Sequence, residues 1–264
     1  MADYVLARKS RNIASNAVHV LLNILLGMGA VLVTVFSASP ILGVILVLVS
    51  KWRVFAVRRR YLWLNIKSNL VDLIVGLSVV FLAYSAGGSL MLVDGILMAV
   101  YVVWLLFIKP LSSENANLVQ ALFAVFLGIS ASTLMSAYLN PVVSVLLAFL
   151  IGYAASRHVL VQTGDEDFSL TTLVCGLVFA EVAWMCNIWG IVYPIEWPGF
   201  STGIIIPQAA VVLTIFAFVY NYVRQVATKY QEDFRFRDVV VPVVFGIVLI
   251  GVIVLVFSPA RYNV

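Results

Sequence analysis

The stretch VVVPVVFGIVLIGVIVLVF, residues 239–257, has no charged side chain in 19 positions. A helix of this length reaches about 28 Å, close to the roughly 30 Å hydrocarbon core of a bilayer. Its apolar residues follow one another without the alternation that is typical of a membrane β-barrel strand. Because lipid offers no hydrogen bonds to the backbone, such a run is stable there only as a helix. The stretch therefore predicts a transmembrane helix.

The composition extends this prediction to the whole chain. Of 264 residues, 63% are hydrophobic and 11% are charged, whereas soluble domains have about 45–50% apolar and about 25% charged residues. We therefore expect an all-α integral membrane protein, a single polytopic helical domain over residues 1–264. The sequence predicts nine transmembrane helices, at about 17–36, 40–57, 69–86, 89–108, 117–134, 140–160, 170–190, 203–223 and 239–257.

The second segment is the weakest of the nine, because Lys51 follows an apolar run of only 11 residues, 40–50. It spans a bilayer only if it includes residues 54–57 and if Lys51 and Arg53 extend to the interface. The alternative is a re-entrant hairpin. The first segment is longer than the core of a signal peptide, so we interpret it as a span and not as a cleaved leader.

The distribution of charge predicts the orientation. With nine spans and a cytoplasmic N-terminus, every Lys and Arg except Arg261 falls on the cytoplasmic side, as the positive-inside rule requires. A re-entrant second segment would reverse all later loops and break this pattern. We therefore expect a cytoplasmic N-terminus and an exterior C-terminus, in the plasma (inner) membrane of a bacterium.

Glu181 lies near the middle of the seventh predicted span, where a bare carboxylate costs about 2.5 kcal/mol or more. No Lys or Arg lies at a similar depth in any predicted span, so we expect a protonated acid that is held by neutral hydrogen-bond donors. The candidate donors are Asn23, Asn187, Thr214 and tyrosine hydroxyls. The carboxyl either takes part in proton or cation transfer or forms a structural hydrogen bond between helices.

Asp72 and Asp94 each lie about one turn inside a predicted span, near opposite faces of the membrane. An acid in the first turn of a helix favours the positive end of the helix dipole, so both fit an interfacial capping role. The alternative hypothesis is that these two acids and Glu181 line one interior path, at three depths, and relay a cation or proton.

A short segment combines cations with aromatic residues, both of which favour the headgroup level of a membrane. It predicts contact with anionic lipid headgroups on the cytoplasmic side, either as a topology-setting loop or as a specific site for a phosphorylated lipid. The residues expected to make this contact are Lys51, Trp52, Arg53, Arg58, Arg59, Arg60 and Lys67.

Other chemistry has little support in the sequence. No catalytic or nucleotide-binding motif is present, and His19 and His158 are isolated from each other and from cysteine, so we expect no cofactor and no metal site. The net charge of +4 comes from cations in a few short loops. Membrane lipids, and not nucleic acid, are therefore the expected partners.

The residues SKWR at 50–53 and NLVDLIVG at 69–76 resemble uncharacterised multi-pass membrane proteins of candidate-phylum bacteria with reduced genomes. That resemblance implies a multi-pass membrane protein and no particular activity.

Three functions are compatible with these features. The first, which we favour, is a small transporter or permease that uses an intramembrane carboxyl. The second is a membrane-embedded enzyme that acts on a lipid-linked substrate. The third is a structural or assembly subunit of a membrane complex. A hydrated cavity at Glu181 would favour transport, a lateral groove open to lipid would favour the enzyme, and a helix contact at Glu181 would favour the assembly subunit.

Overall fold

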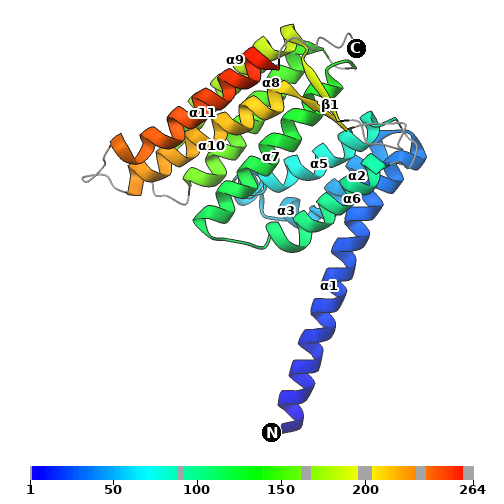
Figure 1. Cartoon of the computed structure of the whole chain (residues 1–264). Helices are drawn as coiled ribbons and strands as arrows, with labels where there is room; N and C mark the ends of the chain where they lie inside the picture. Colours follow the sequence, from blue (N-terminus) through cyan, green and yellow to red (C-terminus); the bar gives the residue numbers. More distant parts are fainter. Residues whose placement is uncertain are drawn as a thin grey trace.

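The computed structural model describes residues 2–87, 92–138, 140–161, 168–195, 204–229 and 236–257, with only the backbone described for residues 2–17. Most of this part of the chain is helical (Figure 1). The elements are α1 (Ala2–Ser37), α2 (Pro40–Ser50), α3 (Trp52–Phe55), α4 (Arg59–Ser68), α5 (Leu70–Ser85), α6 (Leu92–Val103), the π-helix η1 (Trp104–Ile108), α7 (Glu114–Met135), α8 (Pro141–Leu160), α9 (Phe168–Trp189), β1 (Val192–Ile195), β2 (Ile204–Pro207), α10 (Gln208–Lys229) and α11 (Phe236–Val256).

Six of the described helices are long and apolar enough to cross a bilayer: α1 from Val18 onward, and α7 to α11. The pair α4 and α5 passes the same test only as a unit, and the two helices are bent by 63°. The protein thus has the all-α, multi-pass membrane architecture that the sequence predicts. The predicted count of nine spans lacks this support, because α2, α5 and the α6–η1 pair are each shorter than a full span.

The second predicted span does not form one continuous helix. Ser39 begins α2 by accepting a hydrogen bond from the backbone N–H of Ile41, and Pro40 occupies the first helical turn. The helix then ends at Ser50, and α3 is a separate single turn. At about 1.5 Å per residue, α2 alone reaches roughly 16 Å, about half the hydrocarbon thickness.

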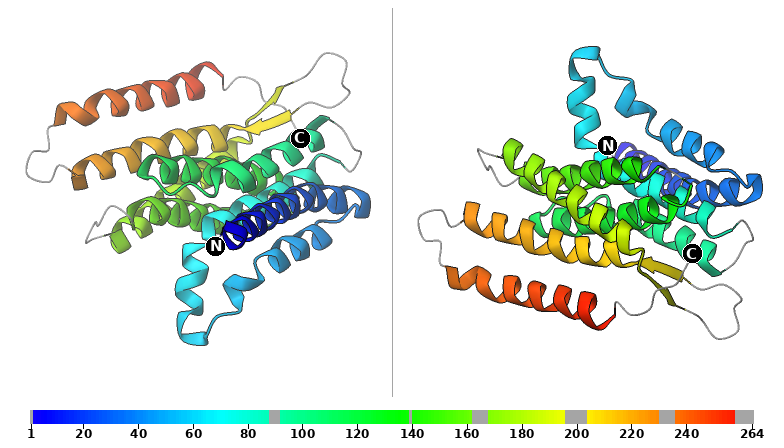
Figure 2. Two further views of the ribbon diagram at one scale, coloured as in Figure 1. Left: turned by 90° about the horizontal axis from the view of Figure 1, so that it is seen from below. Right: turned by 90° about the horizontal axis from the view of Figure 1, so that it is seen from above.

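Two clusters of buried apolar side chains hold the helices together. The first joins α1, α2, α5, α6 and η1, and the second joins α7 to α10. Helix α7 contributes buried residues to both clusters and packs on α5, α8 and α10. It is therefore the central helix of the bundle (Figure 2). Helix α11 packs on α10 and is otherwise largely exposed.

Close packing between α8 and α9 depends on two glycines. A Cβ atom at Gly152 of α8 would overlap the ring of Phe179, and one at Gly176 of α9 would lie 3.0 Å from the backbone oxygen of Phe149. Small residues let membrane helices approach each other closely and gain van der Waals contact. This contact fixes the face of α9 that is turned toward the bundle.

A short antiparallel strand pair follows α9. Strand β1 pairs with β2 in the register Val192 with Pro207 and Ile195 with Ile204. The backbone N–H of Gln208 donates to the oxygen of Ile191, which ties the start of α10 to the strand pair. The predicted eighth span, 203–223, thus begins with strand β2 before it becomes helical at Gln208, and residues 196–203 lie outside the described part of the chain.

Candidate functional site

The three intramembrane acids do not lie together. Asp72 and Asp94 are both buried, at the first turns of α5 and α6. Helices α5 and α6 belong to the first apolar cluster, whereas Glu181 lies on α9, which belongs to the second. One interior path through all three carboxyls therefore has no support from this arrangement. Asp72 has both charged and neutral polar partners among the described residues.

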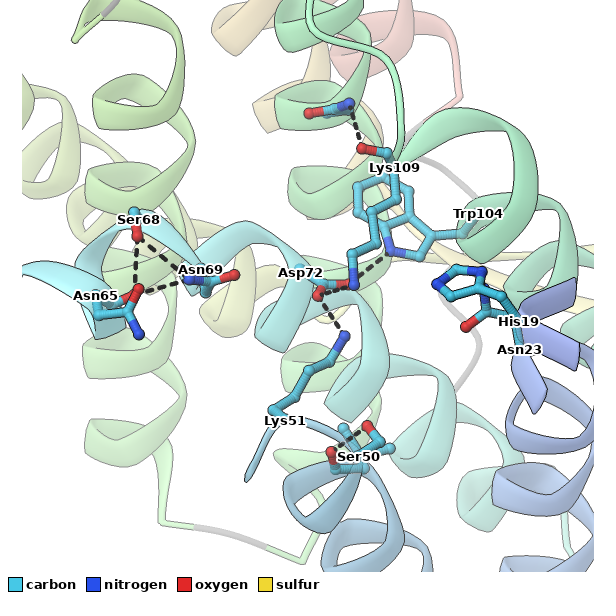
Figure 3. Close-up of polar contacts among 12 residues, drawn as sticks. His19, Asn23, Ser50, Lys51, Asn65, Ser68, Asn69, Asp72, Trp104 and Lys109 are labelled. Atoms are coloured by element: carbon cyan, nitrogen blue, oxygen red, sulfur yellow. Dashed lines mark hydrogen bonds and ion pairs between the residues drawn. The ribbon is translucent and has the colours of Figure 1, made fainter. Parts of the chain in front are cut away.

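Asp72 is the centre of a buried ion cluster (Figure 3). Its Oδ2 accepts from the ammonium groups of Lys51 and Lys109, and the Lys109 Nζ lies 2.7 Å from that oxygen. The indole Nε1 of Trp104 donates to the other carboxylate oxygen, Oδ1, at 3.1 Å. The four side chains come from the C-cap of α2, the first turn of α5 and the two ends of η1. We call Lys51, Asp72, Trp104 and Lys109 the Asp72 cluster.

The Asp72 cluster carries one negative and two positive charges. The side chains of Lys51 and Asp72 are 8% and 10% exposed, whereas that of Lys109 is 41% exposed. Removing one partner from a buried pair leaves an uncompensated charge and costs about 3–5 kcal/mol. Lys51 and Asp72 therefore depend on each other, while Lys109 can direct its ammonium toward water or headgroups.

The π-helix explains how Trp104 and Lys109 reach the same carboxylate. In an α-helix, residues five apart are rotated by about 140° from each other and face different sides. Here the backbone N–H of Lys109 donates to the oxygen of Trp104 at 2.9 Å, which is the wider turn of a π-helix. This turn brings both side chains toward Asp72. Such π-turns are rare and frequently occur at functional sites.

Gln120 of α7 stabilises the end of η1. Its Nε2 donates to the backbone oxygens of Ile108 and Leu111, at 2.8 and 2.9 Å. Its Oε1 lies 2.7 Å from the Nε2 of His158 on α8. The sequence singled out none of Trp104, Gln120 and His158 as site residues, and it counted Lys109 only among the loop cations. Together, Trp104, Lys109, Gln120 and His158 extend the polar contacts around Asp72 across α2, α5, η1, α7 and α8.

The residues predicted to contact lipid headgroups lie on and around α3 and α4, and Lys51 is the one among them that is buried. Trp52, Arg53 and the three arginines 58–60 are exposed, and Lys67 is half-buried. Lys51, at the start of the same segment, is instead buried against Asp72. It lies inside the protein because its ammonium gains a carboxylate partner there, which an interfacial position would not supply.

Glu181 faces outward from α9. The buried face of this helix consists of Thr172, Cys175, Gly176, Phe179 and Ala183. At about 100° per residue, Glu181 is half a turn away from Thr172 and so lies on the opposite face. Its neighbours there are large and exposed, with Leu177 at 56% and Trp184 at 49%.

Two of the donors expected for Glu181 make hydrogen bonds within their own helices. The Nδ2 of Asn23 lies 3.1 Å from the Nδ1 of His19, and Thr214 donates to the backbone oxygen of Ala210. The buried Nδ2 of Asn187 has no hydrogen-bond partner among the described residues. No hydrogen bond from Asn23, Asn187 or Thr214 to the Glu181 carboxyl is present among the described residues.

An apolar cavity of about 130 Å³ lies between α5, α7 and α8. Leu77, Phe81 and Ile151 are among its lining residues, with Ser78 and Ser132 as polar groups. Neither Glu181 nor any member of the Asp72 cluster lines it. Among the described residues, no group of three or more His, Cys, Asp and Glu side chains could hold a metal ion.

Comparison with known proteins adds no further assignment. No protein-family model matches the chain, no curated protein matches it, and no solved structure matches it.

Proposed function

We propose that this protein is a membrane subunit that assembles with a partner protein through the outer face of α9. The observation that carries the proposal is the position of Glu181. It is an acid about 12 Å from the C-terminal end of α9, on the face that is turned away from the rest of the chain. No hydrogen bond or ion pair to Glu181 is present among the described residues.

The energetics favour a covered face. An ionised carboxylate in the hydrocarbon costs about 2.5 kcal/mol or more, whereas the large apolar side chains around it are stable in lipid. Intramembrane acids usually pair with another polar group in a protein interior. Since α9 offers no charged partner on this face, we infer that a helix from outside the chain supplies it.

Charge complementarity indicates the chemistry of the partner. None of the predicted spans of this chain carries a Lys or Arg at the depth of Glu181, so a second copy offers only another acid there. A partner span with a Lys, Arg or His at this depth would neutralise the carboxyl and satisfy its oxygens. We therefore assign the outer face of α9 to a basic transmembrane helix of a different protein.

Site-specific photo-crosslinking in native membranes tests the proposal. A photoreactive amino acid at Leu177, one turn from Glu181 on the same face, should give one defined adduct. Mass spectrometry should identify a single partner that has a basic residue in the middle of a span. The adduct should disappear when Glu181→Leu is added, because the polar contact is lost.

The matched control places the same amino acid at Val248 of α11, which is 57% exposed and faces outward in an apolar helix. This position should give no protein adduct. An adduct with the mass of two copies, an adduct that survives Glu181→Leu, or no adduct at Leu177 would each refute the proposal.

For topology we propose the nine-span arrangement with a cytoplasmic N-terminus, in a bacterial inner membrane. Its support is that α10 and α11 run antiparallel side by side (Figure 2). Arg224 in the C-terminal part of α10 and Arg237 at the start of α11 therefore belong to the same end of this pair. A reporter that fluoresces only in the cytoplasm should be bright at the N-terminus and dark at the C-terminus. Equal signals at both ends would exclude an odd number of spans.

A further inference from the structure

Helices α3 and α4 form a hairpin, residues 52–68, that projects from the side of the bundle (Figure 2). We call it the basic hairpin. It contains five cations and no acid. Helix α4 is bent by 63° from α5, and its main contacts among the described residues are with α3 and α5. The hairpin therefore presents most of its side chains to its surroundings.

One face of α4 combines cations with an indole. At about 100° per residue, Arg59, Arg60, Trp63 and Lys67 fall within one third of the helix circumference. The Lys67 ammonium lies 5.1 Å from the centre of the Trp63 ring, which orders both side chains. Trp63 itself is 66% exposed. This face has the composition that the headgroup layer of a membrane favours.

The basic hairpin is held in shape before any ligand binds. The Nδ2 of Asn65 donates across the hairpin to the backbone oxygen of Val54 at 2.9 Å. The Nδ2 of Asn69 donates to the backbone oxygen of Asn65 at 2.9 Å, which secures the end of α4. The Lys51–Asp72 ion pair joins the residue directly before the hairpin to the first turn of α5 and so closes its base.

We propose that the basic hairpin is a binding site for anionic phospholipids, with the headgroup phosphate held by Arg59, Arg60 and Lys67. Guanidinium groups bind phosphate oxygens through paired hydrogen bonds. Trp63 lies at the level of the glycerol backbone, and the bend between α4 and α5 lays α4 along the membrane surface while α5 enters the bilayer. Lipid binding here is independent of the α9 face.

Native mass spectrometry of the full-length protein in detergent tests this site. Phosphatidylglycerol should bind more tightly than phosphatidylcholine, since only the former has a net negative headgroup. Each cation contributes roughly 1 kcal/mol, so Arg60→Gln should weaken phosphatidylglycerol binding about fivefold, and Arg59→Gln with Arg60→Gln about thirtyfold. Binding of phosphatidylcholine, whose phosphate is offset by its own choline cation, should weaken less than that of phosphatidylglycerol.

The matched control is Arg237→Gln, which removes an exposed cation at the start of α11 and away from the hairpin. It should change phosphatidylglycerol binding less than twofold. Equal losses for Arg60→Gln and Arg237→Gln would show that net charge alone attracts the lipid. That result, or equal affinity for the two lipids, would overturn the proposal.

Discussion

The substitution Asp72→Asn should destabilise the protein strongly, because it removes the carboxylate that two ammonium groups share. Lys109 is 41% exposed and can move its charge toward water, so it loses little. Lys51 is 8% exposed and would retain an uncompensated charge inside the protein. Leaving one charge of a buried pair without its partner costs about 3–5 kcal/mol. The new amide oxygen would still accept the hydrogen bond from Trp104, so the predicted loss comes from the charge and not from the indole.

The measurement is the free energy of unfolding in mixed micelles, from titration with a denaturing detergent and followed by circular dichroism. Asp72→Asn should lower it by about 3–5 kcal/mol, and Lys109→Met by about 1 kcal/mol or less. The double variant Asp72→Asn with Lys51→Met should recover most of the loss, because it removes both buried charges. If the single variant stays within about 1 kcal/mol of the wild type, or the double variant is no better than the single one, the cluster does not stabilise this end of the bundle.

Two further predictions concern packing and the π-helix. Replacing Gln120 with Leu should lower the free energy of unfolding by about 1–3 kcal/mol in the same titration, because the backbone oxygen of Ile108 loses its side-chain donor; no change would show that this hydrogen bond does not stabilise the end of η1. Replacing Gly152 with Ala should cost about 1–3 kcal/mol, because the new Cβ overlaps Phe179 and separates α8 from α9. The control Gly95→Ala, with open space at its Cβ, should be neutral, and equal effects at both glycines would contradict the proposed close contact.

The outward position of Glu181 had a signal in the sequence that the prediction of a buried, hydrogen-bonded acid did not use. Thr172, Cys175, Gly176 and Ala183 are small and repeat with helical spacing, which is typical of a face that packs on another helix. Glu181 is half a turn away from them. The phase of the small residues therefore indicates an acid that faces away from the bundle.

The convergence on Asp72 could not be predicted in the same way. Lys51, Trp104 and Lys109 lie 21 to 37 positions away along the chain. An α-helical pattern would also have placed Trp104 and Lys109 on different sides of their helix. The capping role expected for Asp72 was reasonable from its place in the first turn of a helix. Its actual partners depend on a wide helical turn that no local pattern announces.

Local composition thus determined most of the helical structure of this protein. Uncharged apolar runs of about 20 residues form helices because lipid leaves the backbone no other partners, and residues such as Ser39, Pro40 and Asn140 begin helices through local hydrogen bonds and fixed backbone angles. Tertiary structure decided which charges meet and how α4 leaves the bundle. These outcomes depend on the relative rotation and depth of helices that are distant in sequence. Side-chain packing sets both, and hydropathy carries no information about either.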